Sequence, residues 1–67
     1  MLAYNVMIAE SQNGLTEEYE YFVEATGKFN AKLVALHRHH RIYPYSRGFV
    51  QVLSVEEVEI PTLTDAI

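Results

Sequence analysis

Residues 4–23 have the sequence YNVMIAESQNGLTEEYEYFV, and this stretch decides the fold. Its first part alternates apolar side chains with others, and a period of two with β-branched and aromatic residues predicts a strand. The residues that share one face of this strand are Tyr4, Val6 and Ile8. Asn13-Gly14 follows, a dipeptide that strongly favours a hairpin turn. We therefore expect a first strand, a loop over residues 11–16, and a second strand antiparallel to the first.

The second strand is expected to have one buried and one wet face. Its apolar residues Tyr19, Tyr21 and Val23 alternate with glutamates, which is the pattern of a half-buried strand. A helix is then predicted from Lys28 to about His40, because apolar residues recur there at helical spacing. The expected apolar stripe is Phe29, Leu33 and Leu36, with Ala31, Val34 and Ala35 as a second flank. The remaining arc of the helix holds Lys32, Arg38 and His39.

Two boundaries of this helix are suggested by single residues. Thr26 is the expected N-cap, since its hydroxyl can accept a hydrogen bond from an N–H of the first turn. Pro44 cannot continue a helix, so residues 43–48 are expected to form a loop. The sequence of residues 49–55 then predicts a third strand. Val58 and Ile60 either extend this strand or form a short fourth strand.

The order strand–strand–helix–strand predicts an α+β domain of ββαβ topology. A tight hairpin and a right-handed crossover place the third strand beside the first, in a wholly antiparallel sheet of order 2-1-3. One helix covers one face of this sheet, and the other face is partly open. We expect a single domain over residues 1–60 and a C-terminal tail over residues 61–67.

Composition restricts the class of protein. The chain has 67 residues, 49% of them hydrophobic, which is typical of a small folded domain rather than a disordered segment. It has no cysteine, so neither disulfides nor thiolate chemistry contribute. No apolar run approaches the ~18 residues that a membrane helix needs, and the start of the chain lacks a basic signal-peptide region. We expect a cytoplasmic protein without membrane contact.

Charge is strongly segregated along the chain. All five Lys and Arg residues lie between positions 28 and 47, and no acid lies between them. The acids flank this stretch: Glu10, Glu17, Glu18, Glu20 and Glu24 before it, and Glu56, Glu57, Glu59 and Asp65 after it. Such a distribution steers association toward a partner of complementary charge. The expected partner-binding residues are Lys32, Arg38, Arg41, Tyr43, Tyr45 and Arg47.

Several partners fit this charge pattern. A protein with an acidic groove would be docked by the basic residues, with Tyr43 and Tyr45 as anchors. Cations interleaved with aromatic rings are also used to bind nucleic acid directly, although the net charge of −4 opposes a polyanion. The acidic set could instead mimic a phosphate backbone in a basic groove. A homodimer joined through the open sheet face is a further hypothesis.

Metal binding and catalysis have little support in the sequence. His37 and His40 share a helix face, but two imidazoles are fewer than the three or four ligands of a zinc site, and neighbouring arginines repel a cation. There is no cysteine nucleophile, Gly-rich phosphate loop or serine elbow. We expect no enzyme activity, no catalytic residues, no metal and no cofactor.

Short motifs over residues 3–55 resemble small bacteriophage proteins that disable host machinery. The motifs are Ala3-Tyr4 in the first strand, Gln12-Asn13 at the turn, Glu24-Ala25-Thr26 at the helix entry, and Gly48-Phe49-Val50 opening the third strand. They are similar to a small type I-F anti-CRISPR inhibitor, and the element order is similar to a short phage inhibitor of bacterial RNA polymerase. The resemblance implies a non-enzymatic inhibitor that binds a host complex that handles nucleic acid.

Overall fold

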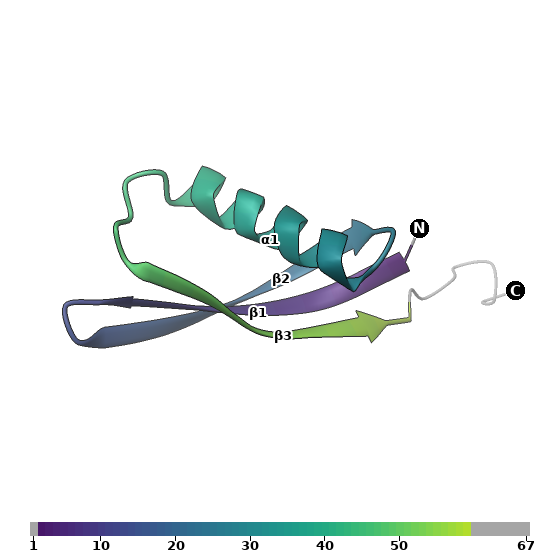
Figure 1. The fold of residues 1–67 in the computed structure, drawn as a ribbon, viewed down its shortest axis with the longest axis horizontal. Helices are drawn as coiled ribbons and strands as arrows, with labels where there is room; N and C mark the ends of the chain where they lie inside the picture. Colours follow the sequence, from purple (N-terminus) through teal and green to yellow (C-terminus); the bar gives the residue numbers. More distant parts are fainter. Residues whose placement is uncertain (1, 60–67) are drawn as a thin grey trace, which may run out of the picture.

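A computed structural model describes residues 2–59 of the chain. Its elements follow the order β1 (Leu2–Gln12), β2 (Leu15–Ala25), α1 (Lys28–Ile42) and β3 (Phe49–Val58) (Figure 1). The three strands form one antiparallel sheet of order β2-β1-β3, and α1 lies across one face. The predicted α+β fold of ββαβ topology is therefore confirmed. The expected tail and Ile60 lie outside the described residues.

The hairpin is tighter than its sequence suggested. Gln12 pairs with Leu15, so the loop holds only Asn13 and Gly14 rather than residues 11–16. Both loop residues have positive φ, 54° and 80°, which is the requirement of a type I′ turn. Because this turn matches the twist of the strands, pairing continues through Ser11 and Thr16 up to the turn itself.

The core lies between α1 and the inner face of the sheet. Its buried members are Tyr4, Val6, Ile8, Tyr21, Val23, Ala25, Ala31 and Ala35. The helix therefore contributes small residues four positions apart, and the sheet contributes the large ones. The small side chains of Ala31 and Ala35 let the helix approach the sheet closely. This arrangement corrects the predicted helix stripe in part, because Phe29 and Leu33 are exposed whereas Leu36 packs against the core.

The helix ends also differ from the prediction. Gly27 is the N-cap, no side chain caps the first turn, and the Thr26 hydroxyl accepts a hydrogen bond from Asn30 instead. The C-terminus extends to Ile42, two residues past His40, and the Tyr43 N–H closes the last turn on the His39 carbonyl. Lengthening the helix by these residues brings its end over the hairpin.

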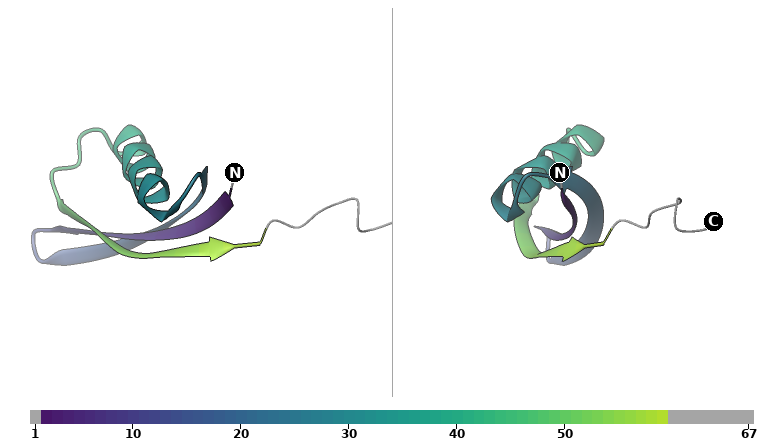
Figure 2. Two further views of the ribbon diagram at one scale, coloured as in Figure 1. Left: turned by 45° about the vertical axis from the view of Figure 1, so that its right-hand side comes forward. Right: turned by 90° about the vertical axis from the view of Figure 1, so that its right-hand side faces the viewer.

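The face of the sheet opposite α1 is acidic. Ala3, Met7 and Ala9 of β1 face away from the core, and the register places Glu24, Glu20 and Glu18 of β2 beside them. Glu56 of β3 pairs with Asn5 on the same face. Figure 2 shows no element over this face within residues 2–59. The cations of the helix and these carboxylates therefore belong to opposite layers of the domain.

Candidate protein-docking surface

Two of the predicted site residues gather on the exposed side of α1. Arg38 and Arg41 line a shallow hollow of about 180 Å³ together with Val34 and His37. We call these four residues the Arg38–Arg41 surface. Positions 34, 37, 38 and 41 share a helix face because they are three or four residues apart. The result is an exposed cationic hollow with one apolar wall.

Arg38 is held in place by the sheet. Its Nη1 donates a hydrogen bond of 2.7 Å to the backbone carbonyl of Phe22 in β2. β2 is an edge strand, and the guanidinium of Arg38 covers this carbonyl. The hydrogen bond also restricts the conformations of the arginine side chain. An arginine with a fixed position loses less entropy on binding a partner, which favours Arg38 as a docking residue.

The other predicted residues are placed differently. Lys32 is half-buried and, six residues before Arg38, lies about 120° away from it around the helix axis. Tyr43 packs its ring 5.2 Å from that of Tyr19 and 5.1 Å from that of His39, although the residue remains 40% exposed. Tyr45 is 93% exposed and Arg47 is exposed in the same loop. The structure thus brings Arg38 and Arg41 together and leaves the other four apart from them.

A polar cluster that the sequence analysis did not identify lies beneath this end of the helix. His39 was expected on the exposed arc, but it is 1% exposed and continues the buried stripe of Ala31 and Ala35. Its Nδ1 lies 2.6 Å from the Tyr21 hydroxyl, and its Nε2 lies 2.6 Å from Oε1 of Glu10. The sequence prediction for His39 is therefore wrong, because both ring nitrogens find partners on the hairpin.

The chemistry of the Glu10 carboxylate determines which atom donates in its hydrogen bond with His39. A carboxylate can only accept, so Nε2 of His39 carries a proton and donates it to Glu10. Nδ1 forms the second hydrogen bond, with the Tyr21 hydroxyl, in which the donor depends on the tautomer of the ring. Every polar atom of the ring is satisfied, and almost no ring surface faces solvent. The cluster therefore joins α1 to the hairpin through two side-chain hydrogen bonds.

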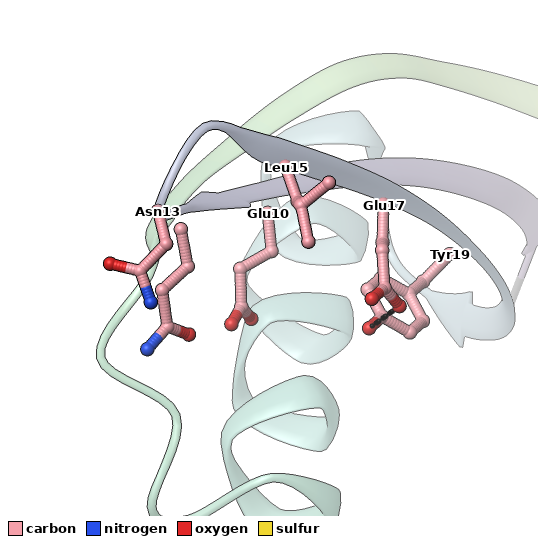
Figure 3. Close-up of a pocket in the computed structure, with 6 residues that line it drawn as sticks. Glu10, Asn13, Leu15, Glu17 and Tyr19 are labelled. Atoms are coloured by element: carbon pink, nitrogen blue, oxygen red, sulfur yellow. Dashed lines mark hydrogen bonds between the residues drawn. The ribbon is translucent and has the colours of Figure 1, made fainter.

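Beyond the end of the helix, the hairpin forms a second hollow on the same side of the sheet. It has a volume of about 200 Å³, and its lining includes Glu10, Leu15, Glu17 and Tyr19 (Figure 3). The Tyr19 hydroxyl donates to Oε2 of Glu17 over 2.9 Å. This hydrogen bond, with burial and the charge of Glu17, raises the pKa of Tyr19 from 10.0 to about 12. Burial likewise raises the pKa of Tyr21.

These two tyrosines predict alkaline destabilisation. Because their pKa values are raised on folding, the native state binds more protons than the unfolded state between pH 10 and about 12. Stability is unaffected by these phenols below pH 10 and falls as the pH rises through that interval. Urea unfolding measured across the interval should show this decline, and a Tyr19→Phe/Tyr21→Phe variant should show a shallower one. Equal slopes in the two proteins would contradict the assignment.

Position 48 requires glycine because the Glu10 side chain leaves no room there for a Cβ atom. A Cβ at this position would lie 2.6 Å from Cγ of Glu10 and 3.0 Å from the carbonyl oxygen of Ser11. Gly48→Ala should therefore displace Glu10 from His39 and cost about 1–3 kcal/mol, typical of overpacking.

A double-mutant cycle tests this reason for Gly48. Glu10→Ala removes the side-chain atoms that lie nearest to the added methyl group. In that background Gly48→Ala should therefore lower the free energy of unfolding much less. The free energies of unfolding of the four proteins, measured in urea, give the coupling. Additive costs would show that Gly48 acts independently of Glu10.

Within residues 2–59 no group of three or more potential metal-ligating side chains comes together. No helix there is long and apolar enough to cross a membrane. No known protein family matches the sequence, and the comparisons found no similar curated protein and no similar solved structure. The surfaces of the domain itself therefore provide the structural indications of its function.

Proposed function

We propose that this chain is a non-enzymatic binding protein that docks through the Arg38–Arg41 surface on an acidic patch of a protein complex that handles nucleic acid, and inhibits that complex. The observation that carries the proposal is the division of charge between two layers. Arg38 and Arg41 are exposed on the helix, whereas glutamates occupy the opposite sheet face. Such a dipole orients the protein as it approaches its partner.

A protein partner fits this surface better than a nucleic acid. Strong binding to a phosphate backbone needs several simultaneous cation–phosphate contacts. Lys32 and Arg47 lie away from the hollow, so its positive charge comes chiefly from two arginines. Two arginines beside the apolar wall of Val34 suit a small acidic patch on a protein, where arginine is a common hot-spot residue.

The class of target comes from the resemblance of residues 3–55 to phage inhibitors. A CRISPR effector complex in the host cytoplasm is the proposed target, and bacterial RNA polymerase is the alternative. Tagged protein should capture such a complex from bacterial lysate, and nuclease treatment should leave the capture intact. Recovery that disappears with nuclease, or recovery of no protein that handles nucleic acid, would contradict the proposal.

Direct binding of nucleic acid is the second candidate function. The exposed ring of Tyr45 next to Arg47 favours it, because stacking and phosphate contact together bind single strands. An oligonucleotide added to the ¹⁵N-labelled protein separates the two candidates. Shifts of amide resonances from Arg38 to Arg47 would support nucleic-acid binding, whereas an unchanged spectrum leaves the protein-docking proposal in place.

A further inference from the structure

The outer edge of β3 has no partner strand within residues 2–59 (Figure 1). Residues 49–55 of this strand have the sequence FVQVLSV, which contains no charge and no proline. Exposed edge strands are usually protected by charges, prolines or bulges because their free N–H and C=O groups pair with other strands, and residues 49–55 of β3 have only a bulge, at Leu53. An uncharged stretch of seven residues with high β propensity is prone to such pairing.

The charges at the two ends of β3 are opposite. Arg47 lies two residues before the strand, and Glu56 and Glu57 lie near its end. When two copies of one strand pair antiparallel, the start of each lies beside the end of the other. Arg47 of each copy would then lie near the two glutamates of the second copy, and the attraction would occur twice by symmetry.

We propose that two copies of this chain associate through the outer edges of β3, paired antiparallel, and so join their three-stranded sheets into one. This interface is separate from the Arg38–Arg41 surface. Pairing would satisfy the free backbone groups of the edge. It would also bury part of the surface of Phe49 and Leu53, which are 71% and 47% exposed in the single chain.

The bulge in β3 fixes the register of this pairing. Met7 pairs with Ser54 and Ile8 with Val52, so Leu53 is an extra residue in β3. The core-facing side chains of the two copies lie on the same side of the joined sheet when Val50 of one copy pairs with Val55 of the other. In this register Gln51 of one copy pairs with Ser54 of the other. The two-fold axis then passes beside Val52, because Leu53 is the extra residue and has no place in the alternation. The bulge of each copy, at Leu53, then lies one residue from this axis.

Other contacts between two copies are electrostatically unfavourable. β2, the other edge strand, carries Glu17, Glu18, Glu20 and Glu24 and no cation, so antiparallel self-pairing would bring like charges together. Two open sheet faces would likewise oppose Glu18, Glu20, Glu24 and Glu56. The edge of β3 is the one of these three surfaces whose charges match its own copy.

A charge-swap experiment tests the interface. Arg47→Glu and Glu56→Lys/Glu57→Lys each turn attraction into repulsion at both ends of the paired strands. Each variant alone should associate about tenfold more weakly or worse, because symmetry doubles the change. An equal mixture should restore association, since the glutamate introduced at position 47 would meet the two introduced lysines, and Arg47 of the other variant would meet the two native glutamates. Analytical ultracentrifugation from micromolar to millimolar concentration measures each case.

The wild-type chain should show a rise in mass from 7.7 kDa toward twice that value, and salt should weaken the rise. Arg41→Glu and Glu18→Lys/Glu20→Lys make the same charge changes away from β3 and should leave association unchanged. Circular dichroism checks that every variant is folded. A wild-type monomer at all concentrations, or a mixture that fails to regain the dimer, would overturn the proposal. Loss of association only in Glu18→Lys/Glu20→Lys would also overturn it.

Discussion

His39→Leu should leave the domain largely unfolded at room temperature. The substitution removes the partner of Glu10 and of the Tyr21 hydroxyl at a site where the histidine is 1% exposed. Leaving a buried polar group without its hydrogen-bond partner costs about 1–3 kcal/mol, and here the Tyr21 hydroxyl and the partly buried Glu10 carboxylate lose their partner together. A core of this size supplies only about 3–5 kcal/mol of net stability. Urea unfolding followed by circular dichroism measures the loss.

Two variants separate this mechanism from a general effect of losing a histidine. His40→Leu changes the exposed neighbour and should alter stability by no more than about 0.5 kcal/mol. Glu10→Met/Tyr21→Phe combined with His39→Leu removes all three polar partners and should regain much of the stability, because no buried polar group is left unpaired. A His39→Leu protein as stable as the wild type would show that the cluster contributes little.

The sheet could be predicted from the sequence because its signals are local. Alternation over residues 4–23 indicated both strands of the hairpin, and Asn13-Gly14 indicated the turn. Strand order then followed from the short hairpin and from the handedness of the crossover. The loop was predicted too long because Ser11 and Thr16 are typical turn residues, yet they pair across the hairpin, with their hydroxyls 2.9 Å apart.

The packing of the helix could not be predicted from hydrophobicity alone. The large apolar side chains of Phe29 and Leu33 are natural candidates for a buried stripe, but the helix faces the sheet with its small residues Ala31 and Ala35 and with His39. Which side of the helix faces inward depends on volumes supplied by strands far away in the sequence. Periodicity by itself does not contain that information.

The sequence contains a weak indication that Glu10 and His39 face the core. Glu10 continues the period-two face of Val6 and Ile8, and His39 lies four residues after Ala35. Both polar residues therefore occupy positions that their patterns assign to the core. Their pairing across 29 residues, and the crowding of Gly48 against Glu10, become visible only in the folded chain.

Reversal of two charges on the Arg38–Arg41 surface should have the largest effect on binding. Arg38→Glu/Arg41→Glu replaces an attractive field by a repulsive one at the site of docking. Electrostatic steering raises association rates by about tenfold to a thousandfold, so the variant should associate with its captured partner at least about tenfold more slowly. The wild-type rate should fall as salt is added, and that dependence should become flat or reverse in the variant.

A matched control keeps net charge from explaining the result. Lys28→Glu/Lys32→Glu lowers the net charge by the same four units, from −4 to −8, on the other flank of the helix. Its association rate should fall much less than that of the arginine variant. Because Arg38 also donates to the Phe22 carbonyl, circular dichroism must show that the arginine variant remains folded.

The most direct test is therefore the association rate of three proteins with the complex captured from lysate, measured over a range of salt concentrations. We predict a large loss of rate and of salt dependence for Arg38→Glu/Arg41→Glu, and a small loss for Lys28→Glu/Lys32→Glu. Equal rates for the wild type and the arginine variant would show that this protein does not dock through the Arg38–Arg41 surface.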